Sequence, residues 1–140
     1  MTSQALAKTL GIKSPQSPLD LIETIRQGLP KQALERLAKA LRVKVLDLEH
    51  ILPVSRRTLQ RYEQQNVKCL PKELSDHMLQ VAKVYARAVE VFEDEERALE
   101  WLQAPIVALG GRIPMSLLDT STGVDLVLTE LGRIEYGVFA

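Results

Sequence analysis

The chain has 140 residues, of which 46% are hydrophobic and only 4% are aromatic. This length suffices for one domain of ordinary size or two small ones, with a core built mainly from aliphatic side chains. Eighteen basic residues balance 18 acidic residues, so the formal net charge is zero, which argues against a wholly basic nucleic-acid coat or an acidic tail. The single cysteine, Cys69, excludes a secreted scaffold held together by internal disulfides.

No apolar run approaches the roughly 18–20 residues of a membrane-spanning helix. Residues 1–10 lack the apolar stretch of a signal peptide. We therefore expect a cytoplasmic protein with no membrane partner. Residues 1–16 are mixed in character and end in turn formers, which predicts an N-terminal arm of low order.

Helices are predicted in chain order from the capping residues and the spacing of apolar side chains. The first is expected to begin after Ser17, a good helix-capping residue, and to end at residues 28–30. Three apolar residues repeat in it at helical spacing, namely Ile22, Ile25 and Leu29. Further helices are expected over residues 30–41, 45–52 and 55–62.

The longest predicted helix begins at Pro71. Its apolar residues follow in steps of four and three as far as Phe92, which at 1.5 Å per residue gives a rod about 33 Å long. Another helix is expected from residue 94 to a stop at Pro105, followed by a rigid turn region over 110–114.

A last helix fits residues 120–132, and Gly132 and Gly137 are expected to break the chain after it. No stretch alternates between apolar and polar residues with a period of two, as a half-buried strand would. The predicted fold class is therefore all-α.

No part of the sequence has the spacing of a known catalytic or metal-binding motif. The only histidines, His50 and His77, fall on different predicted helices. The carboxylates over residues 90–100 spread around a helix instead of converging, so they indicate a solvated helix junction and not a metal site. We expect no catalytic residues, no metal and no cofactor. An enzyme is therefore the third hypothesis, after the two non-enzymatic functions given below.

Positive charge concentrates over residues 55–72. Three arginines there lie in one short predicted helix, which follows another short helix after a tight turn, as in a helix-turn-helix. The N-terminal part of the second helix would enter the DNA major groove, where arginine pairs with guanine and glutamine with adenine. The predicted DNA-binding residues are Ser55, Arg56, Arg57, Gln60 and Arg61. A solvated basic face is the alternative interpretation.

The C-terminal segment, residues 134–140, is rich in apolar side chains and contains a glycine. Two interpretations stay open at this point. The segment folds back onto its own domain, or it docks into the cleft of a partner protein.

Several segments together resemble the Xre/MbcA/ParS antitoxin family: Trp101-Leu102, Ala108–Arg112, Pro114, Leu117–Thr120, Gly123 and Leu131–Ala140, with further similarity over Val54–Leu59 and residues 71–93. The resemblance covers about residues 45–140. It implies an N-terminal Xre/Cro-like helix-turn-helix domain followed by a helical toxin-binding domain. We expect an arm over residues 1–16, a DNA-binding domain over 17–68 and a toxin-binding domain over 69–140.

The resemblance also implies a function. Members of the family neutralise a co-expressed toxin, usually a RES-type toxin that consumes NAD, while relatives act on ADP-ribosylating toxins. They dimerise, cover the active site of the toxin and repress their own operon. The chain is thus expected to be the antitoxin of a RES-Xre type II toxin–antitoxin system. Its expected partners are a cognate RES-type toxin and operator DNA, which it binds as a homodimer within a larger complex. The runner-up is a stand-alone helix-turn-helix regulator whose C-terminal domain oligomerises or senses a ligand.

The same resemblance places toxin binding in the C-terminal segment. The expected toxin-binding residues are Arg133, Ile134, Glu135, Tyr136, Gly137, Val138, Phe139 and Ala140. Aromatic and apolar side chains of this segment would anchor it in the toxin cleft, Arg133 and Glu135 would pair with toxin charges, and the terminal carboxylate would occupy an anion site. Inhibition by occlusion needs no catalytic residue.

Overall fold

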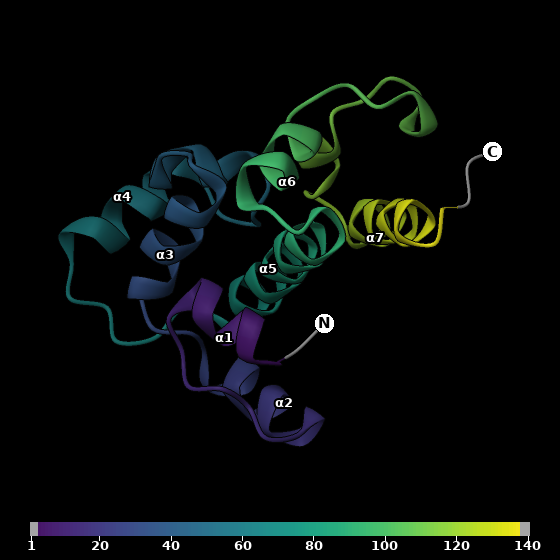
Figure 1. Ribbon diagram of the computed structural model, residues 1–140. Coiled ribbons are helices and arrows are strands. Elements are labelled where there is room, and N and C mark those ends of the chain that lie inside the picture. Colours follow the sequence, from purple (N-terminus) through teal and green to yellow (C-terminus); the bar gives the residue numbers. More distant parts are fainter. Residues whose placement is uncertain (1–2, 138–140) are drawn as a thin grey trace.

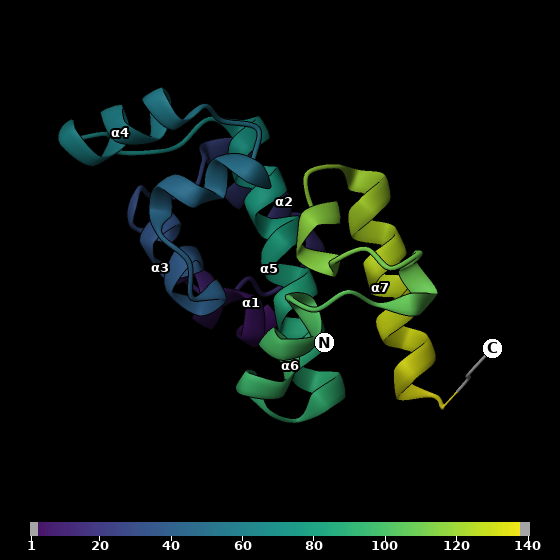
Figure 2. The same ribbon diagram turned by 90° about the horizontal axis from the view of Figure 1, so that it is seen from above.

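The computed structural model describes residues 3–137, and within them the fold is helical throughout (Figures 1 and 2). The α-helices are α1 (Ser3–Leu10), α2 (Pro18–Gln27), α3 (Gln32–Leu41), α4 (Arg56–Gln64), α5 (Lys72–Phe92), α6 (Glu95–Leu102) and α7 (Ser121–Glu135). Three short 3-10 helices are η1 (Val45–His50), η2 (Val107–Leu109) and η3 (Pro114–Leu117). The described chain forms isolated backbone bridges but no strand. The predicted all-α class is confirmed.

Helix α5 is the axis of the molecule. Eleven of its 21 residues are buried, and it packs against α1, α2, α3, α6 and α7. The predicted apolar series is buried from Leu74 to Ala88, and Phe92 at the end is half-buried. Because apolar residues surround much of this helix, it is covered on several sides and one continuous core results.

The prediction of a poorly ordered N-terminal arm is wrong for the described residues. Helix α1 packs on α3 and α5 and buries Leu6, Ala7 and Leu10. The guanidinium of Arg36 on α3 also donates a hydrogen bond to the carbonyl oxygen of Lys8, at 3.2 Å. A helix of eight residues is marginal by itself. Its order comes from tertiary burial, which the local sequence does not display.

Helix α2 begins as predicted. Of the predicted apolar series, Leu29 just after the helix is fully buried, Ile25 is half-buried against the core and Ile22 is exposed. The Ser17 hydroxyl oxygen accepts a hydrogen bond from the backbone N–H of Asp20 at 3.2 Å, which caps the helix. No residue of α2 is buried, Ile22 is 41% exposed and Leu19 is 73% exposed. Ile22 is therefore not part of the core, since α2 packs mainly against α5 and lies beside its first turns.

Two contacts fix the N-terminal end of α7. Gly123 lies so close to the preceding segment that a Cβ atom there would be 1.7 Å from the carbonyl oxygen of Leu117. The Nε2 atom of His77 on α5 donates a hydrogen bond of 2.6 Å to the carbonyl oxygen of Leu118. Both contacts hold the loop before α7 against its neighbours and so set the position of the helix.

The expectation that Gly132 breaks the last helix is wrong, because α7 continues to Glu135. A glycine inside a helix costs only about 1 kcal/mol relative to alanine. Burial of Leu131 and the contacts of α7 with α5 offset this cost.

We expect the substitution Gly123→Ala to lower the free energy of unfolding by about 2–4 kcal/mol, because the new methyl group would overlap a backbone carbonyl. Gly132→Ala is the matched control. Nothing lies within 4 Å of a Cβ atom at that position, so this change is expected to raise the free energy of unfolding by about 0.5–1 kcal/mol. Urea denaturation of both variants measures the difference, and equal stabilities would contradict the close packing at Gly123.

Candidate functional site

The first candidate surface is built on α4. Helix η1 and the buried turn residues Ile51 and Leu52 precede α4, and α4 packs against η1. Leu59 and Tyr62 hold α4 to this unit with exposed fractions of 0% and 7%. The predicted two-helix arrangement is present, although its first helix is of the 3-10 type over most of its length.

The predicted DNA-binding residues all lie on the exposed side of α4 or at its start. Ser55 is the N-cap, and its hydroxyl oxygen accepts a hydrogen bond from the backbone N–H of Thr58 at 3.1 Å. Arg56 pairs with Glu49 of η1, with a distance of 2.7 Å between its Nη1 and the Oε2 of Glu49. The guanidinium of Arg61 lies 5.6 Å from the ring centre of Tyr62, at cation–π distance.

Arg57 and Gln60 differ from these residues. In the described part of the chain, neither side chain has a hydrogen-bonding or ionic partner. Both are exposed and lie one helical turn apart on α4. They are therefore the two side chains of the predicted set that have no competing internal contact.

The second candidate surface is the C-terminal end of α7. Arg133, Ile134 and Glu135 belong to the helix itself, Tyr136 follows at its C-cap with 78% of its surface exposed, and Gly137 has a positive φ of 67°. Ile134 is half-buried. The predicted toxin-binding residues Val138, Phe139 and Ala140 lie outside the described residues.

Glu135 makes a contact that the sequence did not predict. Both of its carboxylate oxygens accept hydrogen bonds from the guanidinium of Arg87 on α5, at 2.8 and 2.7 Å. Arg87 also pairs with Glu90, one turn further along α5. This bidentate contact fastens the C-terminal end of α7 to α5.

Arg87 and Glu135 each favour the charged form of the other. The hydrogen bonds from Arg87 hold the pKa of the Glu135 carboxyl below its ordinary value, and those bonds raise the pKa of Arg87. A depressed carboxyl pKa means that the contact stabilises the fold above the ordinary pKa of glutamate, about 4.3, and is lost as the pH falls through the depressed value. At neutral pH the pair is fully charged.

The two candidate surfaces lie on different parts of the molecule. In both views α4 and the C-terminal end of α7 lie on opposite sides of α5 (Figures 1 and 2). Among the described residues, no group of three or more potential metal ligands converges, and no helix is long and apolar enough to cross a membrane.

Comparison with known proteins supplies the family. Residues 20–83 match the model of the antitoxin Xre-like helix-turn-helix domain, and residues 87–137 match that of the antitoxin Xre/MbcA/ParS C-terminal toxin-binding domain. A "Prs ADP-ribosylating antitoxin" from a Sphingobium strain is 31% identical over 133 residues, which are 89% of this chain and 83% of that relative. The chain belongs to the Xre/MbcA/ParS antitoxin family.

Two further relatives agree with this result. Proteins named "Antitoxin Xre" from Yersinia enterocolitica and Photorhabdus laumondii are 27% and 29% identical to this antitoxin. The Yersinia match covers 99% of this chain and 93% of the relative, and the Photorhabdus match covers 97% and 91%. The predicted family and the predicted order of a helix-turn-helix domain before a toxin-binding domain are confirmed.

Membership of this family decides between the three functional hypotheses, which were an antitoxin, a stand-alone regulator and an enzyme. The protein is an antitoxin with a DNA-binding helix-turn-helix domain and a toxin-binding domain, and it is not an enzyme. The stand-alone regulator is set aside, because residues 87–137 match a toxin-binding domain. The boundary expected between residues 68 and 69 stays a prediction, since α5 is one continuous helix that packs against both parts.

Sequence reasoning missed Arg87 and His77 as the residues that position α7. His77 was noted only as a histidine on a different predicted helix from His50, and Arg87 was not singled out. The partner of His77 is 41 residues away along the chain, and the partner of Arg87 is 48 residues away. No local spacing signals such pairs, because only the packing of α7 on α5 brings them together.

Proposed function

We propose that this antitoxin neutralises a RES-type, NAD-degrading toxin by inserting its C-terminal segment into the active site of the toxin, and that it represses its own operon through α4. The observation that carries the toxin half is the exposed Tyr136 at the end of an anchored helix. Exposed aromatic side chains that become buried in a pocket supply much of the affinity of protein complexes. Anchoring α7 reduces the entropy that the segment loses on binding.

We assign the residues of the segment different tasks. Tyr136 supplies an apolar anchor, together with Val138 and Phe139. Arg133 is exposed and only loosely paired with Glu130, at 3.7 Å, so its guanidinium is available to a carboxylate of the toxin. Glu135 is already engaged by Arg87 and acts as a positioning residue, which replaces the expected pairing with toxin charges.

A second toxin class is favoured by one relative. The name of the Sphingobium protein, "Prs ADP-ribosylating antitoxin", points to a toxin of the ADP-ribosylating class. An ADP-ribosylating toxin also uses NAD, so the same occlusion mechanism would apply to it.

Production of the adjacent toxin with and without the antitoxin separates the two classes. We expect cellular NAD to fall after toxin induction alone, and to stay at its normal level when the antitoxin is present. An ADP-ribosylating toxin would instead label a target protein with ADP-ribose. Such labelling without loss of the NAD pool would contradict the RES assignment while leaving the antitoxin function intact.

We also propose that the antitoxin forms a homodimer through α2. Ile22 is exposed and lines a hollow of about 280 Å³, and the exposed Leu19 precedes it by one turn of α2. Two cations and two carboxylates line this hollow: Arg26, Lys72, Glu73 and Asp76. A two-fold axis would place apolar residues against each other and the cations of one copy near the carboxylates of the other. Two copies of α4 would then read the two halves of a palindromic operator.

The double substitution Leu19→Glu/Ile22→Glu tests this interface. We expect a monomer by light scattering, and operator affinity about 100-fold lower, because one half-site supplies only part of the contacts. Leu126→Glu is the matched control, since it adds a charge at a 49% exposed leucine of α7. Persistence of the dimer in the double variant, or its loss in the control, would place the interface elsewhere.

A further inference from the structure

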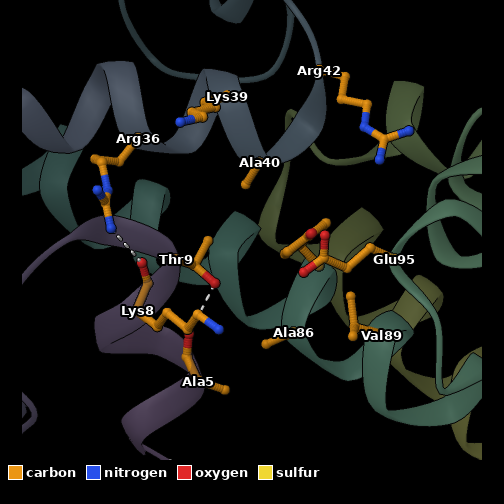
Figure 3. A pocket seen from close by; sticks show the side chains of 11 residues that line it. Ala5, Lys8, Thr9, Arg36, Lys39, Ala40, Arg42, Ala86, Val89 and Glu95 are labelled. Atoms are coloured by element: carbon orange, nitrogen blue, oxygen red, sulfur yellow. Dashed lines mark hydrogen bonds between the residues drawn. The ribbon is translucent and has the colours of Figure 1, made fainter.

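A cavity of about 550 Å³ lies apart from both candidate surfaces, between α1, α3, α5 and the start of α6 (Figure 3). None of the predicted DNA-binding or toxin-binding residues lines it. Its volume falls within the range of about 300–1,000 Å³ that is typical of small-molecule sites. The cavity exists only because α1 packs against the rest of the molecule, since α1 forms one wall.

The cavity is strongly basic although the chain is neutral. Four cationic side chains line it against one carboxylate, Glu95, which gives a local net charge of +3. Arg36 is engaged with the backbone of α1. No ionic partner is found for Lys8, Lys39 or Arg42 within the described chain. Figure 3 shows Lys8 and Arg42 on different walls of the same hollow. Several uncompensated cations around one cavity give it a positive potential that favours an anion.

Tyr85 adds a polar group to this site. Its side chain is 8% exposed and lines the cavity, and no hydrogen-bonding partner for its hydroxyl is found among residues 3–137. In this part of the chain, no side-chain oxygen or nitrogen that is fully sealed from solvent lacks a partner. The Tyr85 hydroxyl is therefore not fully sealed from solvent, and Tyr85 is one of the residues that line the cavity. Burial raises the pKa of Tyr85, so the hydroxyl keeps its proton and is a hydrogen-bond donor at neutral pH.

The remaining lining is apolar. Ala40 of α3 and Ala86 and Val89 of α5 provide methyl groups between the cationic walls (Figure 3). A ligand that consisted only of charge would leave this part of the cavity unused. The combination suits a molecule with one anionic end and one flat or apolar end.

We propose that this cavity binds a small organic phosphate of about the size of a nucleoside monophosphate. Lys8 and Lys39 would hold the phosphate from α1 and α3, the Tyr85 hydroxyl would donate to an acceptor of the ligand, and Ala86 and Val89 would contact its apolar part. The inference is independent of the toxin and operator proposals, because none of their residues is used. A ligand held between α1, α3 and α5 would also stabilise the docking of α1.

Titration of the full chain with adenosine 5′-monophosphate at low salt tests the proposal, by calorimetry and by the thermal midpoint. We expect saturable binding and a rise of the midpoint with ligand concentration. Lys8→Ala/Lys39→Ala should raise the Kd at least about tenfold, and Tyr85→Phe should raise it about threefold. Both lysine side chains are exposed, so their removal should leave the fold intact.

Lys83→Ala is the matched control, because it removes an exposed lysine of α5 that lies outside the cavity. It should leave the Kd unchanged. Absence of binding, or an equal loss in the Lys83 variant, would overturn the proposal. Inorganic phosphate that binds as tightly as the nucleotide would also overturn it, since the apolar lining would then contribute nothing. Operator affinity should be the same in the double lysine variant, and a parallel loss would assign these cations to DNA instead.

Discussion

Removal of residues 136–140 is expected to abolish toxin neutralisation while the antitoxin remains folded. Tyr136 is 78% exposed, so its loss costs little folding free energy. Truncation at this point keeps Glu135 and its contact with Arg87, so α7 stays in place. We expect the Kd for the toxin to rise at least about 100-fold, because the aromatic and apolar anchors are lost together. Survival of toxin-producing cells and calorimetry with purified toxin measure the effect.

Thr129→Ala serves as the control for this truncation, because Thr129 is an exposed α7 residue outside the segment. The thermal midpoint and helical content of the truncated chain should match those of the full chain. A folded, truncated antitoxin that still protects cells would show that other surfaces neutralise the toxin. A complex in which residues 136–140 contact only the antitoxin itself would lead to the same conclusion.

Arg57→Ala is expected to weaken operator binding about tenfold or more, which corresponds to one good base or phosphate contact of about 1–3 kcal/mol. Arg57 is the exposed arginine of α4 without an internal partner in the described chain, whereas Arg56 is held by Glu49. The double variant Arg56→Ala/Arg57→Ala should lose more, and toxin affinity should not change in either. Gel-shift titrations at several salt concentrations provide the measurement.

The salt dependence separates a true DNA contact from a solvated basic face. Affinity that depends on phosphate contacts falls steeply with salt, and the slope should decrease by about one for each phosphate contact removed. Arg97→Ala removes an exposed arginine of α6 and is the matched control. A flat salt response of the unmodified antitoxin would contradict the role of α4.

The positions of the two proposed surfaces determine whether one molecule can bind toxin and operator together. We propose α4 as the operator surface and the end of α7 as the toxin surface, and these two parts lie on opposite sides of α5 (Figures 1 and 2). On that assignment, one antitoxin molecule would bind toxin and operator through different faces. This arrangement is compatible with repression by the whole toxin–antitoxin complex.

The sequence by itself indicated the α-helices after α1, the caps at Ser17 and Ser55, and the family. Capping residues such as Ser17 and Ser55 and the apolar steps of α5 act through neighbours within one or two turns, so their effect can be read along the chain. Only the tertiary structure decided that α1 joins the core, that α2 leaves Ile22 exposed and that α7 continues past Gly132. These outcomes depend on which surfaces meet, as do the contacts of Arg87 with Glu135 and of His77 with Leu118. Burial and pairing across more than 40 residues of chain leave no local pattern, and for that reason the sequence could not reveal them.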